Sequence, residues 1–286
     1  MSDNATRVLF DEPGPRGKVM IVIWSVVVAI VVAALVWAAV IQFDSHGQLA
    51  PERWGFLLNP GIVAFLGEGV RNTFLATGVA ALAAYPLGLL LALGRMAQRR
   101  WLSAVCAGWI EFFRAIPMLL VVYAFLLALP RLTPALALPV FWMLVIPMIL
   151  VSSATTAEVF RAGIKAIDRG QWEAAESLGM TRRTLMRLVI LPQAFRIVLP
   201  ALLTGLVSLL KDSTLGYVVS YPELMQQGRT VTAYYGYLIQ TFLAISVLYV
   251  VLNYLLTKVA SWLQARSTRK ATANPAALVA EPAAAQ

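Results

Sequence analysis

Long apolar runs separated by short polar segments make up most of the chain. Six runs have about the 20 residues that a helix needs to cross a bilayer, and they occupy residues 19–41, 70–93, 102–129, 139–157, 197–219 and 234–259. A helix satisfies its backbone hydrogen bonds internally, as lipid requires. The pattern therefore predicts an all-α integral membrane protein with six transmembrane helices.

The third run is too long for one perpendicular crossing, and Pro117 lies in its middle. Proline removes a backbone donor and bends or breaks a helix. We expect the part before Pro117, which carries Glu111 and Arg114, to lie near the inner interface. The polar residues 221–232, between the fifth and sixth runs, are expected to form an outer loop.

The segment 158–196 departs from the apolar pattern. Its charged residues are Arg161, Lys165, Arg169, Arg182, Arg183, Arg187 and Arg196, mixed with Glu158, Asp168, Glu173 and Glu176. Charges of this density cannot lie in hydrocarbon, where each central charge costs a few kcal/mol. The segment must face water or a partner protein.

Composition supports the membrane assignment and sets the orientation. Hydrophobic residues make up 60% of the chain and charged residues 13%, against about half and a quarter in soluble domains. Most of the 23 Lys and Arg residues lie in the N-terminal tail, after the second run, in the segment 158–196 and at the C-terminal end. The positive-inside rule then places both termini and this segment in the cytoplasm, which accounts for the net charge of +9 without a nucleic-acid partner.

These observations divide the chain into four parts. We expect a cytoplasmic tail (1–18), a first transmembrane helix with its outer loop (19–62), a transmembrane core (63–265) and a disordered cytoplasmic tail (266–286). The core contains the polar segment 158–196 as its cytoplasmic loop.

Candidate enzymatic chemistry is sparse. Cys106 and His46 are too few for a disulfide, a metal site or a His-assisted nucleophile, which argues against a membrane-embedded hydrolase. The chain also contains no GxxxxGK[ST] phosphate-binding loop. We therefore expect a non-catalytic protein with no metal and no cofactor of its own; any ATP that it uses must be bound by a partner.

Two i, i+3 pairs of opposite charge stand near the inner interface, Glu111 with Arg114 and Glu158 with Arg161. This spacing places each pair on one helix face, where the side chains can form an ion pair. The pairs fit either a structural role or a gate at the inner interface.

Within the polar loop, residues 170–179 have a helix-like middle between two glycines. Trp172, Ala175, Leu178 and Gly179 recur at helical spacing and form a small apolar face. Such a helix either folds back on its own spans or docks into a groove of another protein. The residues alone leave both possibilities open.

Several spaced motifs resemble one family. Glu173-Ala174-Ala175, then Gly179, then Ile190-Leu191-Pro192 resembles the EAA loop of ABC importer permeases. The segments 111–117 (EFFRAIP), 158–164 (EVFRAGI) and 210–215 (LKDSTL) are similar to polar amino-acid permeases, and residues 211–224 resemble the glutamate type. The chain departs from the family pattern at Ala115-Ile116 and at 152–156 (SSATT).

The resemblance implies a type I ABC importer permease fold with a cytoplasmic coupling helix, formed by Gly170, Trp172, Glu173, Ala174, Ala175, Leu178 and Gly179. It implies a multi-pass protein of the bacterial cell membrane that imports polar amino acids, with glutamate or aspartate favoured. The expected partners are ATP-binding cassette subunits that hold ATP and Mg, a second permease subunit that is a paralogue, and an extracytoplasmic amino-acid-binding protein.

Polar residues inside two spans are candidates for the substrate path: Ser152, Ser153, Thr155, Thr156, Lys211, Asp212, Ser213 and Thr214. Charges at this depth face a cavity or a partner. Lys211 and Asp212 point about 100° apart on a helix, so they border a path or pair with neighbouring helices. The alternative function is an ATP-independent secondary transporter or channel, which would have no Walker-A ATPase gene beside its own.

Overall fold

The computed structural model describes residues 14–132 and 138–272, and the chain divides into two compact units, Met1–Leu58 and Asn59–Gln286. The N-terminal unit contains helix α2 (Pro15–Ser45) and the short helix α3 (Glu52–Gly55). No residue of α2 is buried, as expected for an apolar helix surrounded by lipid. The predicted tails lie outside the described residues over 1–13 and 273–286.

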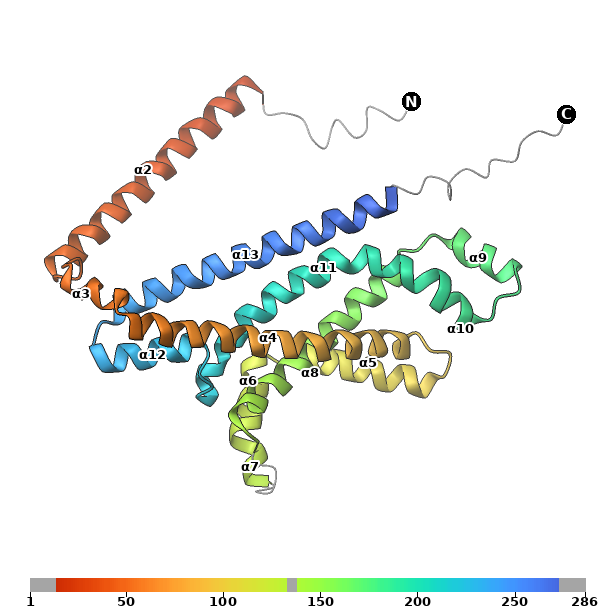
Figure 1. Ribbon diagram of the computed structural model, residues 1–286. Helices are drawn as coiled ribbons and strands as arrows, with labels where there is room; N and C mark the ends of the chain where they lie inside the picture. Colours follow the sequence, from red (N-terminus) through yellow and green to blue (C-terminus); the bar gives the residue numbers. More distant parts are fainter. Residues whose placement is uncertain (1–13, 133–137, 273–286) are drawn as a thin grey trace. The chain divides into compact units, whose positions relative to one another are not determined.

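Four long helices form the framework of the second unit (Figure 1): α4 (Pro60–Arg95), α8 (Val140–Lys165), α11 (Leu191–Asp212) and α13 (Leu238–Thr272). In the described ranges, five helices, α2 included, are long and apolar enough to cross a membrane, and a bent pair can supply a sixth. The prediction of an all-α membrane fold is confirmed.

The bent pair consists of α5 (Arg100–Ala115) and residues 118–132, which diverge by 99°. The second arm runs through α6 (Met118–Tyr123) and a π-helical turn to α7 (Leu129–Leu132). The break falls at Ile116 and Pro117, where the proline cannot donate a helical hydrogen bond.

Close packing of α8 against α4 and α11 forms the core. At Gly88 of α4, an added Cβ would approach the Cβ of Thr156 to 2.8 Å, and at Gly163 of α8 it would collide with Val198 of α11. Small residues allow helix backbones to approach closely in membranes. The contacts between these three helices therefore depend on glycines at the points of closest approach.

The polar segment 158–196 is helical over most of its length. Helix α8 continues to Lys165, so Glu158 and Arg161 lie on its last turns. The segment then forms α9 (Arg169–Ser177), α10 (Arg182–Leu185) and a π-helical turn that leads into α11. Figure 1 shows α9 and α10 at the end of this unit where α4 and α13 finish, whereas α12 (Leu224–Tyr235) lies at the opposite end.

Helix α12 replaces the loop expected over residues 221–232, and a buried carboxylate begins it. Glu223 is fully buried, and its two oxygens accept hydrogen bonds at 2.8 Å from the backbone N–H groups of Met225 and Gln226 and from the hydroxyl of Tyr249 on α13. Burial raises the pKa of Glu223 to about 7, although these hydrogen bonds act in the opposite direction. The polar composition of residues 221–232 predicted a loop. The Tyr249 hydroxyl that helps to hold Glu223 at the start of α12 is distant in the sequence, so it gave no local signal for a helix.

Candidate functional site

Local interactions at both ends define helix α9. The Asp168 carboxylate caps the N-terminus by accepting from the N–H of Gly170 at 2.7 Å. At the other end, Gly179 adopts φ 71°, a conformation that glycine enters without steric cost. The exposed pair Arg169–Glu173, at 2.9 Å, adds an i, i+4 contact. The helix therefore begins one residue before Gly170 and ends before Gly179, close to the bounds of the expected coupling helix.

Helix α9 has one face packed on its own chain and one exposed face. Ala175, 4% exposed, packs in a cluster with the end of α8 and the start of α11, and Trp172 is partly buried against it. The amide of Gln193 on α11 donates to Gln171 at 3.2 Å. Leu178, in contrast, is 76% exposed. The apolar face expected from spacing is thus divided: Ala175 and Trp172 pack on the chain itself, whereas Leu178 is exposed.

The rest of the expected coupling segment is exposed. Gly170, Glu173, Ala174 and Gly179 all face outward. Helix α9 is therefore attached to the ends of two long helices through Ala175 and Trp172, while its exposed residues leave a surface available for a partner.

The polar stripe of α8 divides between buried and accessible residues. Ser153 and Thr156 are buried, and Ser153 donates to the carbonyl of Leu150 at 2.8 Å. Thr155 is exposed and Ser152 is partly exposed. Within this stripe, Thr155 and Ser152 are therefore the residues with accessible surface.

The second set of candidate path residues lies where α11 ends. Lys211 is exposed, Asp212 and Thr214 are partly exposed, and Ser213 is buried with its hydroxyl bonded to the carbonyl of Leu210 at 2.7 Å. The adjacent residues Lys211 and Asp212 thus differ in exposure, as their angular separation on a helix predicts.

The sequence pattern did not lead us to predict two further polar residues of α11 as candidates for the substrate path. Thr204 and Ser208 are exposed and precede Lys211 at helical spacing, so the three share one face of α11. Thr204 also lines a cavity of about 210 Å³ between α11 and α13, together with Thr257 and Ser261. The spacing of Thr204, Ser208 and Lys211 in an apolar span was the available signal.

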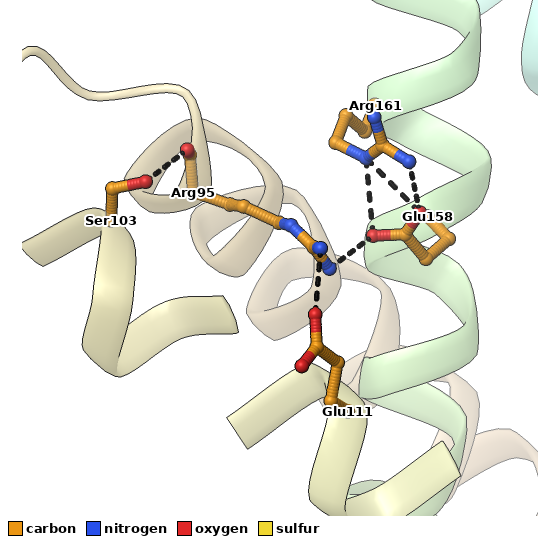
Figure 2. A network of polar contacts seen from close by, with 5 residues as sticks. All are labelled: Arg95, Ser103, Glu111, Glu158 and Arg161. Carbon is orange, nitrogen blue, oxygen red and sulfur yellow. Dashed lines mark hydrogen bonds and ion pairs between the residues drawn. The ribbon is translucent and has the colours of Figure 1, made fainter. Parts of the chain in front are cut away.

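Charged side chains from three helices meet near the end of the unit that carries α9 (Figure 2). Arg95 of α4 donates from Nη1 to Glu158 of α8 and from Nη2 to Glu111 of α5, each at 2.9 Å. Arg161 also pairs with Glu158. We call Arg95, Glu111, Glu158 and Arg161 the ion cluster. The expected ion pair of Glu158 with Arg161 is present. Among the described residues, Glu111 forms its ion pair with Arg95 and not with Arg114.

No metal site accompanies these residues: the described ranges contain no group of three or more His, Cys, Asp or Glu side chains that could hold an ion. The polar chemistry consists of ion pairs, capping carboxylates and hydroxyl groups. These groups are suited to holding helices together and to contacting a polar solute.

A family model described as the binding-protein-dependent transport system inner membrane component matches residues 84–269. The chain belongs to this family. Its matched region begins within α4 and ends within α13, so it includes the ion cluster, α9 and the polar face of α11.

Curated relatives of this transport-system component are amino-acid permeases. The chain is 34% identical over 224 residues to the glutamate transport system permease protein GluD of Corynebacterium glutamicum, covering 77% of this chain and 81% of the relative. It is 30% identical over 209 residues to the probable glutamine ABC transporter permease protein GlnP of Bacillus subtilis, covering 72% and 95%. The arginine transport system permease protein ArtQ of Bacillus subtilis is 32% identical over 196 residues, covering 68% and 89%.

Solved structures agree with the fold. A chain from the crystal structure of an amino acid ABC transporter with histidines superimposes with a TM-score of 0.69 at 31% identity, covering 74% of this chain and 98% of that one. A chain of the MetNI methionine ABC transporter in an inward-facing conformation gives 0.62 at 22% identity, covering 73% and 99%. The component therefore has the type I ABC importer permease fold and is a multi-pass inner-membrane subunit, in a family whose ATPase is a separate chain.

Proposed function

We propose that this chain is the transmembrane permease subunit of an ATP-driven importer for polar amino acids, with glutamate or aspartate as the substrate. The observation that carries the proposal is the construction of α9, whose Ala175 packs on α8 and α11 while Leu178 is 76% exposed. An exposed leucine on a short helix suits a groove in a partner protein. The similarity to GluD, a glutamate transport system permease protein, supports glutamate or aspartate as the substrate.

In this proposal, α9 is the coupling helix between the permease and its ATPase. ATP binding closes two ATP-binding cassette subunits, which displace α9 and switch the cavity from inward-facing to outward-facing. Because Ala175 and Gln171 contact the ends of α8 and α11, those two helices move with α9. ATP and Mg remain in the partner subunits, and this chain contributes no catalytic group.

The substrate path in this proposal borders the polar face of α11 and the accessible part of α8. Thr204, Ser208 and Lys211 present two hydroxyl groups and one ammonium group on one face, and Thr155 adds a hydroxyl from α8. An exposed ammonium group favours a solute with a carboxylate. Because every amino acid has an α-carboxylate and an α-amino group, Lys211 and the adjacent Asp212 suit amino acids in general, and the choice of an acidic one rests on the similarity to GluD.

The proposed assembly requires further subunits. A second permease subunit, which we infer is a paralogue, completes the cavity, and an extracytoplasmic amino-acid-binding protein delivers the solute at the end where α12 lies. The excess of Lys and Arg in the polar loop supports a cytoplasmic position for α9 and both termini in this proposal.

Reconstitution tests the function and the coupling surface together. The chain would be co-expressed with its neighbouring ATPase and permease genes and assayed in proteoliposomes with its binding protein for uptake of radiolabelled L-glutamate. We expect ATP-dependent uptake that unlabelled aspartate inhibits more strongly than glutamine or arginine. Leu178→Glu should reduce uptake by about tenfold or more, since a charge buried in a docking groove costs at least about 1.4 kcal/mol.

Leu132→Glu is the matched control because Leu132 is 80% exposed at the far end of α7, away from α9. It should retain wild-type uptake. Uptake that continues without ATP would instead support the secondary transporter or channel, and undiminished uptake by Leu178→Glu would exclude α9 as the docking helix.

A further inference from the structure

We propose that Arg95 is a positioning residue that makes α5 follow α8 when α9 is displaced. This proposal rests on the proposed function, because it assigns a transmission step to an ATP-driven permease. From sequence, Arg95 is simply one of three arginines that follow the second span. Its surroundings in the folded chain assign it a more specific role.

Arg95 is held in place at its backbone and its side chain. It is the last residue of α4, and its carbonyl accepts from the Ser103 hydroxyl of α5 at 2.7 Å. Its guanidinium donates to Glu111 and Glu158 through two different nitrogens (Figure 2). Of the ion pairs in the described ranges, both of those that join different helices involve Arg95.

The α8 side of this bridge is firmly oriented. Arg161 donates from Nε to both oxygens of Glu158, at 3.1 and 3.0 Å. The carboxylate therefore holds two guanidinium groups and has little rotational freedom. A shift of α8 at this level therefore moves the acceptor of Arg95 directly.

Chain continuity links this position to α9. Glu158 lies two turns before the end of α8 at Lys165, and Asp168, which caps α9, follows three residues later. On the other side, Glu111 lies one turn before the end of α5, where the chain bends by 99° into α6. The bridge thus connects the helix that leads to α9 with the helix that leads to the bend.

The shape of the arginine side chain distinguishes this bridging role from a role in setting the orientation of the protein in the membrane. A guanidinium is planar and can direct separate nitrogens to two carboxylates, whereas a lysine ammonium is a compact point charge. The positive-inside rule counts lysine and arginine alike. If Arg95 only marked the cytoplasmic side, lysine would replace it fully; if it bridges α5 and α8, lysine would not.

The test measures the ATP hydrolysed per glutamate imported, in proteoliposomes that contain the assembled complex and its binding protein. We expect Arg95→Gln to raise this ratio by at least about fivefold, the lower end of typical coupling between sites. Arg95→Lys should also raise the ratio, because it preserves the charge but not the fork. Full rescue of coupling by Arg95→Lys would overturn the proposal.

Glu111→Gln isolates one arm of the bridge, and its side chain is 65% exposed, so folding does not depend on it. We expect the same direction of change, and the double variant Arg95→Gln/Glu111→Gln should be no worse than Arg95→Gln alone, as for two residues in one interaction. Independent, additive effects would contradict the bridge.

Arg99→Gln serves as the control, since Arg99 is exposed in the connection between α4 and α5 and takes part in none of the ion pairs described above. It should keep the wild-type ratio. A wild-type complex without ATP-dependent uptake would overturn the proposed function and this inference together. A coupled wild type with an unchanged ratio in Arg95→Gln would overturn only this inference.

Discussion

Single buried carboxyl groups in a membrane protein have consequences that reach beyond their own helix. Glu223 joins the start of α12 to Tyr249 of α13, and the adjacent backbone N–H of Leu224 donates to Thr73 of α4 at 3.2 Å. Of the other ionisable groups, Tyr221 on the same loop interacts with Glu223, and Arg71 of α4 interacts with Tyr221. Arg229 of α12 lies over the ring of Tyr217, 5.1 Å from its centroid. Among the described residues, no cation forms an ion pair with Glu223.

This burial predicts a pH dependence of stability. The pKa of Glu223 rises from 4.5 in the unfolded chain to about 7 when folded, so its contribution is fully present below pH 4.5 and is lost as pH rises through 7. The shift corresponds to about 3 kcal/mol. Thermal unfolding in detergent should therefore show a higher midpoint at pH 5 than at pH 8.

Glu223→Gln should remove most of this difference, because the amide does not titrate. Glu68→Gln, at an exposed position of α4, should leave it intact. A pH dependence that persists unchanged in Glu223→Gln would show that another group is responsible.

At the scale of elements, glycines determine how closely the long helices approach. Gly163 of α8 lies against Val198 and the carbonyl of Ala194 on α11, so a Cβ has no room there. Gly108 of α5, also inside a helix, has no neighbouring atom within 4 Å of an added Cβ. The same substitution should therefore have opposite effects at the two positions.

Gly163→Ala is expected to destabilise the protein by about 1–3 kcal/mol through overpacking. Gly108→Ala is expected to be neutral or stabilising by up to about 1 kcal/mol, the helix propensity difference. Thermal unfolding of both variants at one pH measures the contrast. Equal unfolding midpoints would mean that α8 and α11 can move apart to accommodate a Cβ at residue 163 without loss of stability, which would contradict the packing described.

At the scale of the whole molecule, the region that matches the family model excludes the first span. The match covers residues 84–269, and residues 1–58 form a compact unit separate from residues 59–286. Helix α2 has no buried residue. The second unit has its own hydrophobic core, formed mainly by residues of its long helices.

Deletion of residues 1–58 should leave a membrane-inserted protein that unfolds at nearly the wild-type temperature, because residues 59–286 form a compact unit of their own. Size-exclusion chromatography and thermal unfolding in detergent would measure this. Aggregation of residues 59–286, or a large drop in the midpoint, would show that α2 supports the second unit.

The sequence by itself determined the features that depend on neighbouring residues. Apolar run length specified the long helices, Pro117 marked the break before α6, and Gly179 marked the end of α9. Motif spacing identified the permease family, since Glu173, Gly179 and Pro192 are separated by fixed intervals. Each of these signals is local, and local backbone chemistry is largely independent of the rest of the fold.

Only the tertiary structure decided which distant groups meet. Spacing offered Arg114 as a partner for Glu111, because residues on one helix face are close in any fold. Folding brought Arg95, from the end of another helix, to that carboxylate instead. Likewise, burial of Glu223 against Tyr249 made a helix of residues expected to form a loop. A single sequence specifies contacts within a helix directly, whereas contacts between helices depend on how their faces pack.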